Sequence, residues 1–313
     1  MQPQSPTSSD GRGDEIAGIV GAQTERLRRS IEIGMRHVRA EQTNELERIM
    51  ATIDEAPYFP LLDHDGHGGV ELRFLTDFPA VREYYGARHG SYEIVSSRHI
   101  TAVATEFYTF RESIATLRGV GDVGGVDSDG QIFAVNSAVM FPTGPGGIGG
   151  EIVWTRYPFG DIVGGTVEPE VPAEGPVHLP NTRIRNAEQY DRYLDGWRAG
   201  DAAAMAESLT DDARWLRRIR RGTGTALVNT EGLAETRTAI AADIATWQPV
   251  VIEVLNRVVS EWYVFADLYL ELRHSGTGTT EHRRHIALHP VGPDGRLRAE
   301  MGDVRVIAPE PSA

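Results

Sequence analysis

The sequence predicts an α+β fold that occurs twice in tandem, each copy with helices first and an antiparallel sheet after them. An internal repeat is the first observation. Residues 140–147 (MFPTGPGG) match residues 288–295 (LHPVGPDG), 148 residues later in the chain. Further segment pairs keep the same order along the chain: 54–58 with 211–215, 107–110 with 262–265, and 160–163 with 302–305. Because chance matches would not stay collinear, we interpret the chain as two related domains.

Helical periodicity at the start of both halves is the second observation. Apolar residues recur at three- and four-residue spacing from 15 to 53, with one break, which predicts two helices. The second half repeats this pattern from 190 to 209, interrupted at Gly200. A third helix with a capped start is predicted in each half, beginning in segments 77–81 and 230–234.

Segments rich in β-branched and aromatic residues follow the helices in both halves, and they are the third observation. They predict strands at 92–100, 103–117, 131–140 and 151–157, and again at 250–260, 262–273, 281–289 and 297–307. Helices on one face of an antiparallel meander form an α+β architecture.

Composition and periodicity also predict where the domains begin and end. We expect a disordered tail over 1–14, a first domain over 15–163, a linker over 164–185, a second domain over 186–308, and a tail over 309–313. A chain of 313 residues can form two domains that each bury a core of their own.

The overall composition excludes several classes of function. A formal charge of −14 argues against a nucleic acid as the partner, because a phosphate backbone requires a basic face. The absence of cysteine excludes disulfides, thiolate metal sites and cysteine nucleophiles, and it fits a cytoplasmic protein. No segment approaches the roughly 18 apolar residues that cross a bilayer, so no membrane partner is expected.

Two segments of the second half carry a family resemblance. Residues 193–201 (YLDGWRAGD) and 209–213 (LTDDA) resemble the opening of NTF2-like domains, and they are most similar to the SnoaL-like and ketosteroid-isomerase-like branch. The resemblance covers about 186–308 well and about 31–163 more faintly. It implies tandem NTF2-like (cystatin-like) cones, in which a strongly curved sheet wraps around helices and a pocket opens at one end. It also implies dimers formed through the outer sheet face.

The alternation of side chains separates the two faces of the longest strand. The resemblance assigns one set to the inside of the cone: Trp262, Val264, Ala266, Leu268 and Leu270. The other set faces outward: Tyr263, Phe265, Asp267, Tyr269 and Glu271. In the first half the outward set is Tyr108, Phe110, Glu112 and Ile114. Exposed aromatic rows of this kind require a cover. We therefore expect the two halves to pack sheet to sheet as an intramolecular pseudo-dimer, and a further homo-oligomer is left open.

The resemblance also implies where the catalytic groups of the second domain lie. The family's oxyanion-binding tyrosine falls on Tyr193, but its carboxylate base falls on Arg217 and its acid on Ala287. A guanidinium stays protonated and cannot act as a base at neutral pH. We therefore do not expect isomerisation of a ketosteroid by the family mechanism.

Other residues of the second domain remain candidates. His285 lies two residues from Ala287 on the same face and has the chemistry of a general acid or base. Trp215 and Arg217 are expected near the mouth of the cone, where they would bind an anionic or enolate-bearing ligand. Asp303 is a further catalytic candidate, although its match with Asp161 equally favours a role in the fold.

The first domain departs further from the family pattern. His37 or Arg36 matches Tyr193, and Tyr58 replaces Trp215 as a ligand-binding candidate. Arg111 is expected inside the first cone, where a charge requires a partner. That partner is a ligand carboxylate or, as we favour, an internal glutamate. His37 and Glu41, four residues apart on one helix, are a catalytic pair or, as we favour, a surface pair.

We predict no metal and no cofactor. Among His282, His285 and His289, the first lies on the opposite face of its strand, which disfavours coordination by all three. His64 and His67 lie in a glycine-rich loop and are expected to be solvated. Residues 119–124 have dinucleotide-binding spacing but lead into a strand rather than a helix, so we interpret them as a hairpin loop.

Two functions are consistent with these observations. The resemblance implies a cofactor-independent enzyme (isomerase, cyclase, hydratase or dehydratase) that acts on a hydrophobic, oxygenated small molecule such as a polyketide or steroid-like compound. The alternative is a non-catalytic module that binds a small molecule or a protein. The lost carboxylate base favours the module, whereas Tyr193 and the histidine-bearing strand favour the enzyme.

Overall fold

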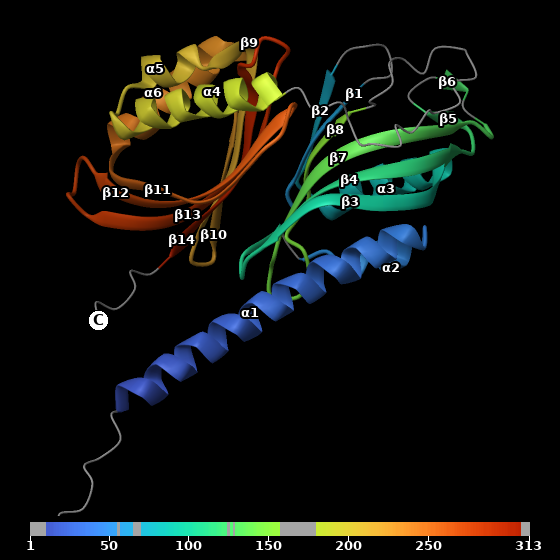
Figure 1. Cartoon of the computed structure of the whole chain (residues 1–313), viewed down its shortest axis with the longest axis horizontal. Helices are drawn as coiled ribbons and strands as arrows, with labels where there is room; N and C mark the ends of the chain where they lie inside the picture. The colour runs from blue at the N-terminus through green and yellow to red at the C-terminus, as the bar shows by residue number, and fades with distance from the viewer. Residues whose placement is uncertain are drawn as a thin grey trace, which may run out of the picture.

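The computed structural model describes residues 11–54, 57–64, 70–123, 126–127, 129–156 and 180–307, and it contains two six-stranded sheets (Figure 1). The first half consists of α1 (Gly11–Gln42), α2 (Leu46–Met50), β1 (Phe59–His64), β2 (Val70–Leu75), α3 (Phe78–Ser91), β3 (Tyr92–Ala104), β4 (Tyr108–Gly119), β5 (Asp122–Val123), β6 (Val126–Asp127), β7 (Ile132–Pro142) and β8 (Ile152–Arg156). The second half consists of α4 (Pro180–Arg198), α5 (Ala202–Glu207), β9 (Leu209–Arg221), β10 (Gly224–Asn229), α6 (Gly232–Thr246), β11 (Trp247–Val259), β12 (Tyr263–His274), β13 (Thr280–Pro290) and β14 (Leu297–Ile307).

The two large sheets have the same topology. Their strand orders are β2-β1-β8-β7-β4-β3 and β10-β9-β14-β13-β12-β11, so each strand of one sheet has a counterpart in the other. In both sheets the last strand returns parallel to the first, β8 beside β1 and β14 beside β9. The α+β class and the tandem arrangement are therefore confirmed. Each sheet is mixed rather than wholly antiparallel, because β1 and β9 pair in parallel with β8 and β14. The hairpins β1–β2 and β9–β10 were not expected from the sequence.

Two helices begin before the residues at which the domains were predicted to start. Helix α1 begins at Gly11, inside the expected tail, and α4 begins at Pro180, inside the expected linker. Residues 1–10, 157–179 and 308–313 lie outside the described part of the chain, and with them the rest of both tails, most of the linker and Asp161. Among the described helices, none has the length and hydropathy required to cross a membrane.

Aspartate residues cap the start of two helices, and a glycine follows the end of a third. Asp77 accepts a hydrogen bond from the backbone N–H of Ala80 at 2.8 Å and thereby caps α3. Asp201 caps α5 in the same way, with N–H donors from Ala203 and Ala204. Gly200 has a φ of +67°, a left-handed conformation that ends α4 with little strain.

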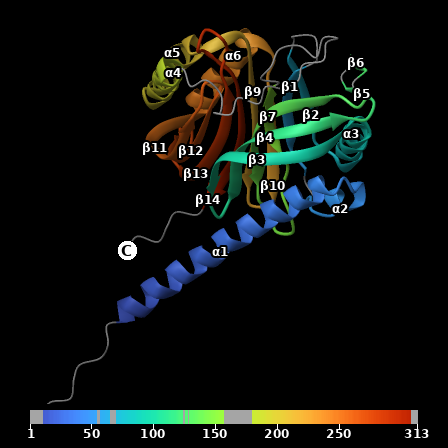
Figure 2. The same ribbon diagram turned by 45° about the vertical axis from the view of Figure 1, so that its right-hand side comes forward.

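Each sheet has helices on one face and the other sheet on its opposite face. In the second half, α4, α5 and α6 cover the inner face of the sheet (Figure 1). In the first half, α1 and α3 contact β3, and α1 runs past the ends of both sheets (Figure 2). Each half thus has a hydrophobic core of its own.

A third core forms between the outer faces of the two sheets. The ring of Phe110 stacks on the ring of Phe265 at 4.1 Å between centroids. The hydroxyl of Tyr108 donates to Oδ2 of Asp267 at 2.8 Å, and the hydroxyl of Tyr263 donates to Oε2 of Glu112 at 2.8 Å. The outward-facing rows predicted from the sequence therefore contact one another.

Trp262 lies in this third core and not inside the cone as expected. Strand β12 begins one residue later, at Tyr263, so the alternation of the strand does not extend to Trp262. Its indole nitrogen donates to Oε1 of Glu112 at 3.2 Å.

Candidate active site in the second domain

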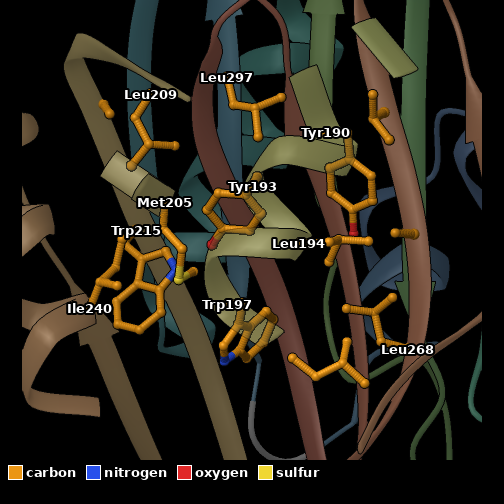
Figure 3. Packing of buried hydrophobic residues seen from close by; sticks show 14 of the residues in the cluster. Tyr190, Tyr193, Leu194, Trp197, Met205, Leu209, Trp215, Ile240, Leu268 and Leu297 are labelled. Atoms are coloured by element: carbon orange, nitrogen blue, oxygen red, sulfur yellow. The ribbon is translucent and has the colours of Figure 1, made fainter. Parts of the chain in front are cut away.

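Aromatic and charged side chains share the interior of the second domain. Tyr190, Tyr193 and Trp197 lie on one face of α4 at three- and four-residue spacing, and Figure 3 shows them in one cluster with Trp215 of β9. Alternation along the strands places further residues on the same inner face: Trp215 and Arg217 on β9, His285 and His289 on β13, and Glu300 on β14. All of them are at most 3% exposed.

Glu300 is the centre of this group. Its Oε2 accepts a hydrogen bond from the hydroxyl of Tyr193 at 2.6 Å, and its Oε1 accepts one from Nε of Arg217. Nε2 of His285 lies 3.1 Å from the same Oε1. Three of the residues predicted from the sequence therefore converge on a carboxylate that the sequence analysis did not single out.

The charges of the group follow from burial and from these contacts. Burial raises the pKa of Glu300, but Arg217 and His285 outweigh it and hold this pKa well below 4.5. Burial, and then the charge of Glu300, raises the pKa of Tyr193 well above 10. Burial lowers the pKa of His285 below 6.5 against the opposing charge of Glu300. At neutral pH the group therefore contains a carboxylate, a phenol and an uncharged imidazole.

Arg217 lies between two indole rings. Its guanidinium carbon is 3.7 Å from the ring centroid of Trp215 and 5.0 Å from that of Trp197. Its Nη1 donates to Oδ2 of Asp243 on α6 at 3.2 Å, and the side chain of Asp243 is 21% exposed. Arg217 and Trp215 are thus buried deeper than the mouth position expected for them, and Asp243 connects the group toward solvent.

Several polar atoms of this interior have no hydrogen-bonding partner among the described residues. They are the hydroxyl of Tyr190, Nε1 of Trp215, Nη2 of Arg217, Nδ1 of His289 and both ring nitrogens of His285, whose Nε2 lies near Glu300 without the geometry of a hydrogen bond. Buried polar groups are paired in the large majority of cases, because an unpaired one costs about 1–3 kcal/mol. Unpartnered atoms gathered in one interior indicate a place where water or an oxygenated ligand binds.

Asp303 does not join this group. It lies on the opposite face of β14, where Nε of Arg218 donates to its Oδ1 at 2.6 Å and Nε of Arg220 is at 3.3 Å. Burial opposes its ionisation, but these arginines and Arg305 lower its pKa well below 3.8. The structure therefore separates Asp303 from His285 and Tyr193, with which the sequence analysis had grouped it.

Tyr58 is also placed elsewhere. It is fully buried in the core between the two sheets, and the guanidinium of Arg218 lies 4.9 Å from its ring centroid. It does not line the first cone, because its place just before β1 turns it to the outer face of the sheet.

A second polar group fills the interior of the first domain. Nε2 of His37 is 2.6 Å from Oε1 of Glu151, and the hydroxyl of Tyr85 donates to the same oxygen at 2.7 Å. His37 is fully buried and Glu41 is 6% exposed, so the favoured surface pair is wrong. The helix that carries them packs on the sheet, which the residue spacing alone did not reveal.

Arg111 has the internal partner that the sequence analysis favoured. Its Nη2 lies 3.5 Å from Oε2 of Glu41, and Nη1 of Arg88 lies 3.1 Å from Oε1 of the same carboxylate. The guanidinium carbon of Arg111 is also 5.2 Å from the ring centroid of Phe141.

The first-domain group has one arrangement that could hold a metal ion. Ligand atoms of His37, Glu41 and Glu151 all lie within 4.8 Å of one another. However, the guanidiniums of Arg88 and Arg111 both pair with Glu41, so the group already contains two positive charges for its two carboxylates. A divalent cation would add uncompensated charge to a buried site, so these residues do not fit one.

Glu300 was missed although the repeat contains a signal for it. The register of the two sheets makes Glu300 the counterpart of Glu151, 149 residues earlier, close to the offset of the strongest repeat. Aligning Asp161 with Asp303 obscured this match, because strand register cannot be read from the sequence.

The second half also resembles a known protein family. Residues 190–300 match the family model of the SnoaL-like domain, a segment that runs from Tyr190 to Glu300. The second half is a SnoaL-like domain. No curated protein matches the chain significantly.

Solved structures were compared as well. One is a ketosteroid isomerase-like protein from Erwinia carotovora atroseptica, with 18% identity, 40% of this chain and 96% of that chain covered, and a TM-score of 0.31. Another is an LEH-like epoxide hydrolase from M. tuberculosis, with 12% identity, 40% and 84% covered, and a TM-score of 0.31. A third is a hypothetical protein with a ketosteroid isomerase-like fold from Catenulispora acidiphila, with 11% identity, 37% and 83% covered, and a TM-score of 0.31.

Proposed function

We propose that the SnoaL-like domain is a cofactor-independent acid–base enzyme for a hydrophobic, oxygenated small molecule, with His285 as the proton carrier. The observation that carries this proposal is the His285–Glu300 pair. Nε2 of the imidazole faces a buried carboxylate, whereas its Nδ1 has no partner among the described residues. In the tautomer that carries its proton on Nε2, beside the carboxylate, Nδ1 is available to accept a proton.

The charge states support a base rather than an acid in the resting site. Because burial lowers the pKa of His285, the imidazole is neutral and can accept a proton at neutral pH. The carboxylate of Glu300 would then stabilise the imidazolium that forms. Tyr193 donates its hydrogen bond to Glu300, so it acts as a positioning residue in this scheme rather than as the oxyanion donor that the resemblance implies.

Arg217 supplies the complementary electrostatics. Its Nε is occupied by Glu300, but its Nη2 has no partner, so it can donate to an oxygen on which negative charge develops. Proton abstraction next to a carbonyl by His285, with the enolate oxygen at Arg217, is a step shared by isomerases, cyclases and some lyases. The surrounding tryptophan, leucine and isoleucine side chains favour a hydrophobic ligand such as a polyketide or steroid-like compound.

The alternative is a non-catalytic binding module. The burial of the polar group favours it. The group is at most 2% exposed, and the charges of Arg217 and Glu300 balance each other. An enzyme with this site must open to admit a substrate. A binding module could use the same unpartnered atoms without moving a proton.

Proton exchange distinguishes these functions without knowledge of the natural substrate. We would follow exchange of the α-protons of hydrophobic ketones, beginning with 2-tetralone, in deuterated water by NMR, with tryptophan fluorescence as the measure of binding. The proposal expects exchange that His285→Gln abolishes while binding persists. His282→Gln is the matched control, because His282 lies on the same strand but contacts Tyr269 at 2.7 Å outside the site. Equal exchange in both variants, or binding without exchange, would contradict the enzyme.

A further inference from the structure

A basic cleft lies where the two domains and α1 meet. It has a volume of about 430 Å³ and is lined from three parts of the chain: α1, the segments after β3 and β7 in the first domain, and the ends of β9 and β14 in the second. Both views show α1 passing the ends of the two sheets at this place (Figures 1 and 2). Volumes of roughly 300–1,000 Å³ are typical of small-molecule sites.

The lining is strongly positive in a chain of formal charge −14. It contains Arg26, Arg29, Arg220 and Arg305 but a single carboxylate, that of Glu106. Arg26 pairs with Glu106. Arg29 donates to the carbonyl of Pro145, which is a neutral acceptor.

Two of the arginines that line the cleft also contact a buried carboxylate beside it. One buried carboxylate, Asp303, is shared by Arg218, Arg220 and Arg305, at distances of 2.6, 3.3 and 3.4 Å. Among the described residues, the four lining arginines therefore face two carboxylates, those of Glu106 and Asp303. Concentrated guanidinium charge of this kind is costly unless an anion balances it.

Two buried polar atoms at the cleft have no partner among the described residues. They are Oγ of Ser30, a residue 1% exposed, and Nη2 of Arg220. One is a hydroxyl and the other a guanidinium N–H, and both donate hydrogen bonds to oxyanions. They come from α1 and from β9, so a ligand held by both would bridge the two domains.

We propose that this inter-domain cleft binds a small molecule that carries a phosphate group. A phosphate monoester has a charge of roughly −1.5 to −2 at pH 7, which matches the excess of the lining arginines over these two carboxylates better than a single carboxylate does. Guanidinium forks fit phosphate oxygens in pairs. The cleft is larger than one phosphate, so it has space for an organic body.

Calorimetric titration of the intact chain tests this site. The probes are phenyl phosphate and benzoate, which share a ring but differ in charge. We expect phenyl phosphate to bind and benzoate to bind at least about tenfold more weakly. Failure of phenyl phosphate to bind, or equal affinity for the two probes, would overturn the proposal.

Variants then locate the binding. Arg220→Gln should weaken phenyl phosphate binding about tenfold or more, whereas Arg298→Gln should leave it unchanged. Arg298 is on β14, the strand next to β9, and it pairs with Asp212 at a distance of 2.6 Å, away from the cleft. Ser30→Ala removes an unpartnered hydroxyl, so it should fold at least as well as the unaltered chain and still bind more weakly. Equal affinity of the Arg220 and Arg298 variants, or unchanged binding by Ser30→Ala, would place the ligand elsewhere.

Discussion

Glu151 and Glu300 are equivalent residues at the centres of the two domains. The repeat pairs Met140 with Leu288, and in both sheets the strand neighbour of these residues directly follows the glutamate. Each glutamate accepts a hydrogen bond from a tyrosine hydroxyl and lies beside a histidine nitrogen. The two interiors thus contain the same combination of groups around one carboxylate.

The partners of the two glutamates come from different elements. Tyr85 belongs to α3 and His37 to α1, whereas Tyr193 belongs to α4, the counterpart of α1, and His285 belongs to a strand. The two domains therefore place a tyrosine and a histidine beside the glutamate from different elements of the fold. This explains why matching the first domain to Tyr193 by sequence leads to His37 rather than to a tyrosine.

Replacing Glu300 should destabilise the second domain strongly. Glu300→Gln leaves the buried guanidinium of Arg217 with a neutral neighbour, and breaking a buried pair costs about 3–5 kcal/mol. Urea unfolding followed by tryptophan fluorescence would measure the change. Glu253→Gln on the exposed face of β11 is the control and should stay within about 0.5 kcal/mol. A Glu300 variant as stable as this control would show that the pair contributes nothing.

Acid should destabilise the fold through His289. Burial lowers the pKa of His289 from 6.5 to about 4, so the unfolded chain binds the proton more readily than the folded one. The contribution of neutral His289 to the free energy of unfolding should therefore be fully present above pH 6.5. It should fall by about 3 kcal/mol as the pH decreases to about 4. His289→Phe should reduce this slope. Unfolding free energies from pH 7 to 4 would show it, and identical slopes in the two chains would contradict the prediction.

A proton should lie in the hydrogen bond at each of the two ring nitrogens of His37. The hydroxyl of Thr52 donates to the carbonyl of Ile49 at 2.6 Å, so its oxygen accepts from Nδ1 of His37 at 2.5 Å. Nε2 of His37 is 2.6 Å from Glu151, which requires a second proton between these two groups. Nitrogen-15 NMR should therefore show protons bonded near both ring nitrogens. A spectrum in which Nε2 lacks any coupled proton, as in an isolated neutral tautomer, would contradict this arrangement.

The fold was predictable from the sequence because its signals are local and occur twice. Helix periodicity and caps such as Asp77 and Asp201 depend on neighbours a few residues away. The outward rows that include Phe110 and Phe265 follow from alternation within one strand. The hairpins β1–β2 and β9–β10 were missed, because β9 is rich in arginine and does not resemble a strand with one apolar face.

The site was only partly predictable, since it depends on register between strands. The sequence identified Tyr193, Arg217 and His285, which the structure brings together around one carboxylate. It selected Asp303 instead of Glu300. The two residues are only three positions apart on β14, but they face opposite sides of the sheet. A shift of one residue in the pairing exchanges the two faces, and no local pattern fixes that shift.

The core between the sheets should make the two domains unfold together. Phe265→Ala removes a ring that stacks on Phe110 and contacts Tyr108, and such a change costs about 3–5 kcal/mol. We infer that this contact takes the place of the dimer interface implied by the family resemblance, so the chain should remain a monomer at the sheet face. Calorimetry should show one transition for the unaltered chain and two for the variant, with Leu227→Ala, at a 46% exposed position, as the control. Two separate transitions in the unaltered chain would mean that the domains are energetically independent.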